Sequence, residues 1–395
     1  MGGSSTSSAD FGAPAAAGVY AHVPFCRTLC PYCDFTIARS DPDAHAGLAR
    51  ALLGEWRRRG GGLRPRTVYF GGGTPTELPA ELLTGLVREL CAAGTAVEVT
   101  VEANPESATP ATLRALRSAG VTRLSLGVQS TRAHLLELLG RGHGAGGARA
   151  AFDAAREAGF DSVNVDLMFG LPGQADADWA GTLDEVLAWR PDHVSAYALE
   201  LNPRVPMARR IESGRVAPLS EQQAGRHYEH LCARMRGAGW RHYEISNFCL
   251  PGHESAHNLG YWQDRPYLGL GPGAHSFDGR DRSWNVRPHR VYARRIEAGG
   301  DAEEGRETPT PEQRRLERLF LALRTAGGVE LGSLGPGAEA AAGKWAGLQD
   351  TDRVTCAAGR LSLTEAGFWY SQTLTADLAS ALPPLPGDEP GDGIR

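Results

Sequence analysis

Residues 19–33 read Val19-Tyr-Ala-His-Val-Pro-Phe-Cys26-Arg-Thr-Leu-Cys30-Pro-Tyr-Cys33, a short apolar segment that leads into a loop with three cysteines. The C-x3-C-x2-C spacing brings three thiolates close enough to bind a single metal centre. Iron–sulfur clusters are held by cysteine thiolates, usually four of them. Three thiolates from one loop, without an obvious fourth, therefore indicate a [4Fe–4S] cluster with one iron open to another ligand.

Two other interpretations of the cysteine loop come from the residues alone. Zinc also binds thiolates, but structural zinc normally has four protein ligands, often two cysteine pairs, and this sequence has no second pair. A disulfide is disfavoured because the spacing is tight and we expect an intracellular chain. The other four cysteines are scattered and read as ordinary reduced thiols.

Length, charge and hydropathy exclude several classes of protein. A chain of 395 residues has room for one large domain and a smaller one. The net charge of -5 gives no basic surface, so we expect no nucleic-acid partner. Residues 1–18 contain no Lys or Arg and are expected to be a flexible N-terminus rather than a secretory signal. We predict a cytoplasmic protein without an integral membrane segment.

Short β-rich segments alternate with amphipathic segments over residues 19–240. This alternation predicts a parallel α/β fold. The expected strands are Val19–Val23, Thr67–Phe70, Val97–Ala103, Arg123–Val128, Ser162–Phe169 and His193–Leu199. The expected helices are Asp43–Arg59, Ala80–Ala92, Pro110–Ser118 and Ala145–Ala158.

The expected strands have one apolar and one polar face. Between residues 97 and 102, three valines alternate with Glu98, Thr100 and Glu102, and the strands at 123–129 and 162–168 alternate in the same way. Strands buried on both faces would be hydrophobic throughout, and closed eight-stranded barrels fill their interior with bulky side chains. The pattern predicts a partial (β/α)6 barrel whose polar lumen holds a ligand. An antiparallel sheet with one solvated face is the alternative.

The chain after residue 240 divides into three parts. Residues 241–300 are rich in histidine and aromatic residues. Residues 301–310 read as a charged linker that opens a smaller α+β accessory domain at 301–382, with helices at Glu312–Thr325 and Glu365–Ser380 and a strand at Arg360–Leu363. Residues 383–395, rich in Pro, Gly and Asp, are expected to be a disordered tail.

Residues able to bind a polar ligand recur where the expected strands end. A glycine run, Gly71–Gly73, allows close backbone approach, and Glu102, Gln129 and Asp166 lie on the polar faces of successive strands. Each alone is more often a satisfied polar group, but together they indicate one shared ligand at the carboxyl edge of the barrel. Carboxylates suit ammonium and hydroxyl groups, and Arg141 suits a carboxylate.

A second group of candidates surrounds His257-Asn-Leu-Gly-Tyr261-Trp262. Histidine, tyrosine and tryptophan together provide an imidazole ligand beside a flat aromatic surface. From the residues alone, a loop whose aromatic side chains cap the barrel is the favoured interpretation.

Together these motifs resemble the radical S-adenosylmethionine (SAM) superfamily and, more narrowly, the group of oxygen-independent coproporphyrinogen III oxidases and related haem chaperones. The resemblance rests on the cysteine loop with its flanks Tyr20–Cys26 and Tyr32–Phe35, on Asn164–Gln174 and on His257–Trp262. It covers most of residues 18–380. It implies a radical-SAM barrel in which Cys26, Cys30 and Cys33 bind a [4Fe–4S] cluster. It further implies that the SAM-contacting positions are Tyr20, Gly72, Gly73, Thr74, Glu102, Gln129, Arg141 and Asp166.

The resemblance also separates two functions. His257 heads an H-N-x-x-Y-W signature that is associated with haem binding in the chaperones, whereas the oxidases carry a further cysteine at the position of Phe35. Only 19 residues precede Tyr20, whereas the oxidases have a longer N-terminal segment. We expect a haem chaperone that binds the cluster, SAM and haem and passes haem to acceptor proteins. The alternative is an enzyme that decarboxylates coproporphyrinogen III. Whether SAM is cleaved stays open.

Overall fold

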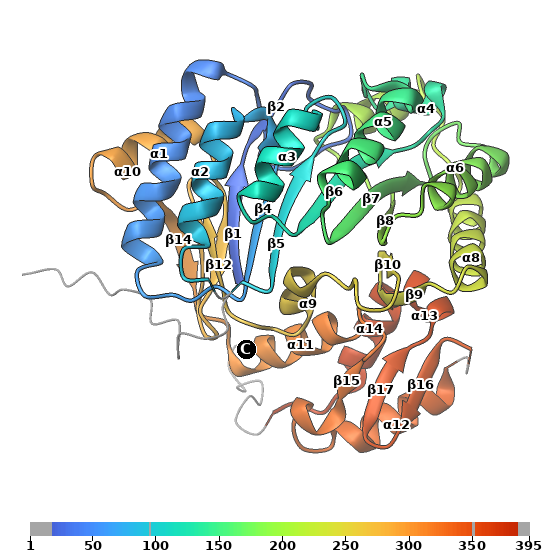
Figure 1. Cartoon of the computed structure of the whole chain (residues 1–395). Coiled ribbons are helices and arrows are strands. Elements are labelled where there is room, and N and C mark those ends of the chain that lie inside the picture. Colours follow the sequence, from blue (N-terminus) through green and yellow to red (C-terminus); the bar gives the residue numbers. More distant parts are fainter. Residues whose placement is uncertain (1–17, 95, 350–351, 386–395) are drawn as a thin grey trace, which may run out of the picture.

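The centre of the structure is a large sheet in which six consecutive parallel strands are each followed in sequence by a helix (Figure 1). The computed structural model describes residues 18–94, 96–349 and 352–385, so the expected flexible N-terminus and disordered tail fall almost wholly outside the described residues. The strands are β1 (Gly18–Val23), β4 (Thr67–Gly72), β5 (Glu98–Ala103), β6 (Arg123–Gln129), β7 (Ser162–Phe169) and β8 (His193–Ala198). The helices that follow them are α1 (Pro42–Arg59), α2 (Ala80–Leu90), α3 (Pro110–Ser118), α5 (Gly144–Ala158), α6 (Asp176–Trp189) and α8 (Glu221–Gly237), with short α4 (Ala133–Leu138) and α7 (Pro206–Glu212).

Further strands extend both sides of this parallel core. On one side β11 (Tyr267–Leu270) runs parallel to β1 and is followed by antiparallel β12 (His275–Phe277), β13 (Arg282–Asn285) and β14 (Glu303–Glu307). On the other side β10 (Asn247–Cys249) and β9 (Arg241–Glu244) continue from β8. Among the described residues β9 and β14 end the sheet without pairing with each other, so the barrel stays open. The prediction of a partial barrel is confirmed.

The apolar face of each strand packs on the helices, as the alternation predicted. Val99, Val101, Leu124 and Val163 are all at most 3% exposed and belong to one continuous core with α2 and α3. A helix that presents an apolar stripe to a sheet derives most of its stability from that burial. The opposite strand face is left with the polar residues, which surround the lumen.

The expected linker at 301–310 is wrong, because Glu303–Glu307 form the edge strand β14. Arg282 pairs with Glu307 in register, and their side chains lie 3.1 Å apart. Charged side chains are typical of an exposed edge strand. The charged composition of this segment therefore reflects its position at the edge of the sheet and not a linker. Thr310 accepts a hydrogen bond of 3.2 Å from the Gln313 amide and begins a helix, with Pro311 in its first turn.

The C-terminal part is a small α+β unit beneath the main sheet in Figure 1. Its strands, in the order β15 (Val329–Glu330), β17 (Arg360–Leu363) and β16 (Val354–Ala357), pack with α11 (Pro311–Ala322), α12 (Ala338–Leu348), α13 (Glu365–Trp369) and α14 (Ser371–Ala381). The helix expected over Glu365–Ser380 is interrupted at Tyr370. The α+β prediction is confirmed, whereas the division into domains at fixed residues stays a prediction.

The remaining elements connect these parts. They are β2 (Phe25–Cys26), β3 (Ala38–Arg39), α9 (Ala256–Trp262), α10 (His289–Glu297) and two 3-10 turns, Pro75–Glu77 and Leu331–Leu334. No helix in the described ranges combines the length and the apolar character needed to cross a membrane.

A buried carboxylate joins the first helix to the strands added after the barrel. Glu55 of α1 is 0% exposed and accepts hydrogen bonds from the Gly271 amide at 2.9 Å, Asn285 at 2.8 Å and Tyr292 at 2.6 Å. Arg59 lies 2.7 Å from the same carboxylate. These partners belong to α1, the loop after β11, β13 and α10, so one charge connects four segments.

We predict that Glu55→Ala lowers the free energy of unfolding by about 3–5 kcal/mol, because it removes the carboxylate partner of Arg59 and leaves the buried donors of Gly271, Asn285 and Tyr292 without their acceptor. Urea denaturation measures the loss. The matched control is Glu297→Ala, whose carboxylate pairs with Arg50 at the surface, where the two side chains are 46% and 68% exposed. The control substitution should lower the free energy of unfolding by about 1 kcal/mol or less. Equal losses in the two variants would contradict the role given to Glu55.

Candidate functional site

The cysteine loop is held at the carboxyl end of β1 by a small pair of strands. The Ala38 amide donates to the Pro24 carbonyl and the Ser40 amide to the Cys26 carbonyl, both at 2.8 Å, which pairs β2 with β3. A turn follows, in which the Cys33 amide donates to the Cys30 carbonyl at 3.2 Å. The thiols of Cys26, Cys30 and Cys33 are all free and line one cavity.

The glycine run after β4 lets the backbone approach this loop. Gly72 has φ of +113°, which side-chain-bearing residues rarely adopt. A Cβ on Gly73 would lie 2.6 Å from the carbonyl of Pro24. The amides of Gly73 and Thr74 instead donate to the carbonyls of Val23 and Phe25, at 2.8 and 2.7 Å. Gly72 and Gly73 thereby form the wall of the cavity next to the cysteines.

Glu102 ends β5 inside the cavity. Its two oxygens accept hydrogen bonds from the Tyr69 hydroxyl at 2.7 Å and from the Gly72 amide at 3.1 Å. Burial raises the pKa of Glu102 to about 7, and the nearby Asp166 carboxylate adds to the rise, while the two hydrogen bonds oppose it. No cation neutralises this carboxylate among the described residues, which suits a ligand that donates hydrogen bonds.

Asp166 of β7 lies two strands away from Glu102, on the same polar face of the sheet. Ser125 donates to one oxygen at 3.0 Å and Asn164 to the other at 2.7 Å. Asn164 also donates to Ser195 at 3.0 Å, so three neighbouring strands share one polar network. Burial raises the pKa of Asp166, and these hydrogen bonds lower it.

A β-bulge turns Gln129 into the cavity. The register between β6 and β7 shifts between Gly127 and Gln129, and Gln129 has a left-handed φ of 66°. Bulges re-aim side chains next to functional sites. A Cβ on Gly127 would lie 2.9 Å from Asn104 Oδ1, so a side chain at this position would displace the Asn104 amide.

A chain of hydrogen bonds connects Arg141 to the cysteine loop. Arg141 donates to Asn104 at 2.6 Å, Asn104 to the Thr74 hydroxyl at 2.8 Å, and that hydroxyl to Cys26 Sγ at 3.6 Å. Arg141 also donates to Tyr32 at 3.3 Å, but its Nε is buried and forms no hydrogen bond among the described residues. One donor of a buried cation thus stays available to a ligand in the cavity.

The cavity has a volume of about 970 Å³, near the top of the range of roughly 300–1,000 Å³ typical of small-molecule sites. It contains nine of the twelve residues proposed from the sequence. These are Cys26, Cys30, Cys33, Gly72, Gly73, Glu102, Gln129, Arg141 and Asp166. Tyr20 and Thr74 lie behind the wall, where Tyr20 bonds His22 at 3.0 Å and Thr74 supports Cys26.

The cavity also extends far from the cysteines, toward the C-terminal helices. This second end is lined by Tyr197, Ile245, Arg324 and Trp369, among others. The alternation of polar and apolar residues along β8 is a weak signal for Tyr197, which lies on the polar face of that strand. Sequence reasoning gave no signal for Trp369 or Arg324, because they come from the accessory part.

His257 lies outside this cavity, at the amino ends of the strands. It is 3% exposed, and both ring nitrogens are hydrogen-bonded, Nδ1 to Thr67 at 2.8 Å and Nε2 to Tyr261 at 2.9 Å. Tyr69 stacks on its ring, and burial lowers its pKa to about 3. In this conformation His257 has no nitrogen free for iron, so its assignment as a haem ligand stays a prediction that requires α9 to move.

The position of α9 follows from Glu98, a residue that sequence reasoning placed in the lumen without a role. Its carboxylate accepts hydrogen bonds from the amides of Ala256 at 2.7 Å and His257 at 3.1 Å. Ser255 caps the same helix by accepting from the Asn258 amide at 3.3 Å. A carboxylate at a helix N-terminus is electrostatically favourable, and here it holds α9 against β5.

Comparison with known proteins gives the family. Residues 20–186 match the model of the Radical SAM superfamily. The haem chaperone HemW of Mycobacterium tuberculosis (strain CDC 1551 / Oshkosh) is 39% identical over 327 residues, which cover 80% of this chain and 84% of that protein. HemW of Bacillus subtilis (strain 168) is 36% identical over 317 residues, which cover 78% of this chain and 84% of that protein. The chain belongs to the HemW family.

A solved structure agrees with this fold. Coproporphyrinogen III oxidase (HemN) from Escherichia coli, a radical SAM enzyme, superposes with a TM-score of 0.80 over 93% of this chain and 91% of that one, at 23% identity. At this identity the similarity shows the fold alone. The HemW relatives carry the assignment to a family, and the resemblance inferred from the motifs is confirmed.

Membership of the radical SAM superfamily implies a [4Fe–4S] cluster and SAM as cofactors of the HemW fold. The described residues fit both groups. Three free thiols share the cavity with two buried carboxylates and with the unpartnered Nε of Arg141. Thiolates are the ligands of iron–sulfur clusters, while carboxylates and a guanidinium suit the amino, hydroxyl and carboxylate groups of SAM.

Proposed function

We propose that the chain is a haem chaperone that holds a [4Fe–4S] cluster and SAM, binds haem and transfers it to acceptor proteins. The supporting observation is the similarity to HemW, which extends over 327 residues and so beyond the barrel segment 20–186. A cytoplasmic location and the absence of a nucleic-acid partner stay predictions from composition.

In this proposal Cys26, Cys30 and Cys33 hold the cluster, which together with SAM supplies one-electron chemistry when both are bound. The protein's own residues bind and orient the cofactor. Glu102 and Asp166 accept hydrogen bonds from its donors, and Arg141 donates to its carboxylate. Because these groups are buried, each contact is stronger than it would be in water.

The end of the cavity toward the C-terminal helices suits haem. Haem is an apolar disc with two carboxylates, and this end offers Tyr197, Ile245 and Trp369 as flat or apolar surface. Arg324 forms no ion pair shorter than 4 Å with a carboxylate of the described residues, and burial lowers its pKa to about 10. A desolvated cation of this kind gains most from a new anionic partner, so a haem propionate is a suitable ligand for Arg324.

Phe35 distinguishes the chaperone from the oxidase alternative. The side chain is 68% exposed and lines the cavity beside the cysteine loop. A further cysteine, which the motif of the oxidases has at this position, would add a thiol to the cavity wall. An aromatic ring adds apolar surface there without adding a nucleophile or a metal ligand.

We expect anaerobically reconstituted protein to contain about four irons per chain. Replacement of Cys26, Cys30 or Cys33 by Ala should abolish this iron, because each would remove one of three ligands. Iron analysis and the visible spectrum measure the effect. Cys91→Ala and Cys249→Ala are the matched controls and should retain the iron. Retention in all three loop variants would refute the cluster assignment.

SAM affinity should rise with pH in the wild type. An ionised Glu102 accepts hydrogen bonds at both oxygens and attracts an ammonium group, whereas its protonated form has lost the charge and uses one oxygen as a donor. Because its pKa is about 7, we expect roughly a fivefold to tenfold gain in affinity between pH 6 and pH 7.5. Glu102→Gln should remove the pH dependence and weaken binding about tenfold to a hundredfold at pH 7.5, since a hydrogen bond to a charged group contributes about 1.5–3 kcal/mol.

Calorimetry on cluster-loaded protein provides this measurement. Glu221→Gln, a cavity carboxylate on α8 rather than at a strand end, is the control and should keep the wild-type profile. A pH profile in Glu102→Gln that equals the wild type would assign the titration to another group.

Haem titration tests the proposed function. We expect saturable haem binding with a shifted Soret band, and no decarboxylated product when the same protein is incubated anaerobically with SAM, reductant and coproporphyrinogen III. If His257 is the ligand, His257→Ala should weaken binding, while Thr67→Val should strengthen it, since the bond that holds Nδ1 in the wild type is removed.

The pair of variants separates ligation from packing. If His257 is only structural, both variants should lower the melting temperature and leave the haem spectrum unchanged. Product formation from coproporphyrinogen III would favour the oxidase alternative, and absence of saturable haem binding would overturn the chaperone proposal.

A further inference from the structure

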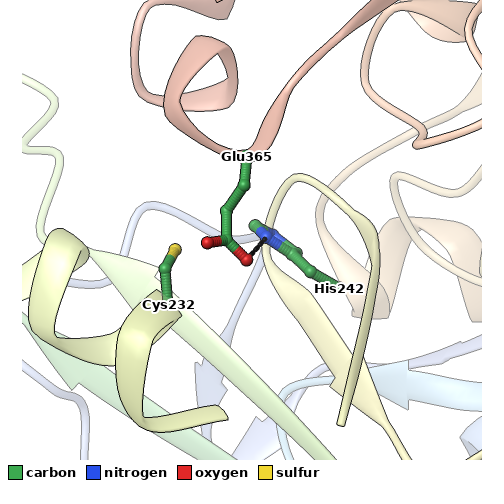
Figure 2. A group of neighbouring side chains, drawn as sticks. All are labelled: Cys232, His242 and Glu365. Carbon is green, nitrogen blue, oxygen red and sulfur yellow. Dashed lines mark ion pairs between the residues drawn. The ribbon is translucent and has the colours of Figure 1, made fainter. Parts of the chain in front are cut away.

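Three metal-binding side chains converge where the accessory part meets the barrel, outside the cysteine loop. Cys232 comes from α8, His242 from β9 and Glu365 from the first position of α13. A ligand atom from each lies within 4.8 Å of the other two. Figure 2 shows the three side chains pointing toward one another from separate segments. A thiol, an imidazole and a carboxylate are together the donor types that zinc takes.

His242 is buried with an unpartnered nitrogen directed into this group. Its side chain is 6% exposed and lies between Phe248, stacked at 4.0 Å between ring centroids, and Phe368, edge-on at 5.0 Å. The Nδ1 atom is buried and forms no hydrogen bond among the described residues. Buried polar atoms without a partner are rare and call for an explanation.

The spacing of the group suits an ion better than a direct contact. His242 Nδ1 lies 3.7 Å from Glu365 Oε2, which is within the range of an ion pair (dashed line in Figure 2) but too long for a hydrogen bond. In a tetrahedral zinc site with Zn–N and Zn–O bonds of about 2.0–2.2 Å, two such ligand atoms lie roughly 3.4 Å apart. The observed separation is therefore close to that of two ligands on a shared ion.

The remaining contacts leave the required atoms available. Arg236 pairs with Oε1 of Glu365, so Oε2 is the oxygen that faces His242. Cys232 is only 3% exposed, and its thiol interacts with the side chain of Tyr228, whose hydroxyl donates to the Glu365 carbonyl at 2.8 Å. That hydrogen bond ties the backbone of α13 to α8 and so fixes the position of the carboxylate relative to the thiol.

We propose that Cys232, His242 and Glu365 bind one Zn²⁺ ion that fastens α13 to α8 and β9. The thiol of Cys232 releases its proton to solvent on binding, and water completes the four ligands. Phe368 and Trp369, which follow Glu365 in α13, line the large cavity. The ion therefore holds one wall of that cavity in place.

Zinc binding must be measured without interference from the cysteine loop, which also offers thiols. The parent protein for the test is the full chain with Cys26→Ser, Cys30→Ser and Cys33→Ser. We expect one zinc per chain by elemental analysis, and with Co²⁺ alone a visible spectrum that includes a thiolate-to-metal band. Cys232→Ser or His242→Gln in this parent should weaken zinc binding by more than about tenfold, since loss of a supporting contact alone costs that much.

Cys249→Ser is the matched control, because Cys249 is an equally buried thiol on the neighbouring strand β10. It should keep one zinc per chain and the rise in melting temperature that zinc causes in the parent. The wild-type chain with its cluster reconstituted should contain zinc in addition to iron. Circular dichroism checks that each variant is folded, and Glu365→Gln replaces any variant that is not. A parent that binds no zinc, or zinc binding unchanged in Cys232→Ser and His242→Gln, would overturn the proposal.

Discussion

Two lumen carboxylates that form no ion pair among the described residues are the constraint around which this barrel is arranged. Glu102 and Asp166 lie on the same lumen face of the sheet, and hydroxyl, amide and, for Glu102, backbone donors stabilise them. A charged carboxylate in this poorly solvated lumen carries a desolvation free energy that must be offset by hydrogen bonds or by a ligand. The positive φ at Gly72 and the bulge at Gln129 both place donors or polar side chains beside these groups. The sheet positions these carboxylates in the lumen, where we propose that they meet the cofactor.

Much of this arrangement is predictable from the sequence, for a local reason. The strand Ser162–Phe169 and the helix Pro110–Ser118 agree with the structure to the residue, because periodicity and capping residues act over a few positions. The lumen-facing ends of the strands were predicted for the same reason. The strand within the charged segment 301–310 was not predicted. It forms because β13 pairs with it, and composition alone does not reveal that pairing.

The remaining failures concern contacts between distant parts of the chain. His257 has an aromatic setting in the sequence, but only the fold shows that Thr67, nearly 200 residues earlier, occupies one of its nitrogens. Cys232, His242 and Glu365 form no motif, since they meet only when the accessory part packs on α8 and β9. Arg324 and Trp369 likewise join the cavity from outside the barrel. Tertiary packing brings these residues together, and no periodic pattern in the sequence predicts it.

The open sheet has a mechanical consequence. A closed barrel has its diameter fixed by the number and stagger of its strands, whereas here β9 and β14 do not pair with each other in the described part of the chain. The width of the lumen is therefore set by the elements that pack across the gap rather than by backbone hydrogen bonds. Trp369 and Gln372, at the junction of α13 and α14, are among the residues that line the cavity there. A small tilt of these helices would change the width of the lumen without breaking a pair of hydrogen-bonded strands. The same barrel would then accommodate ligands of different size.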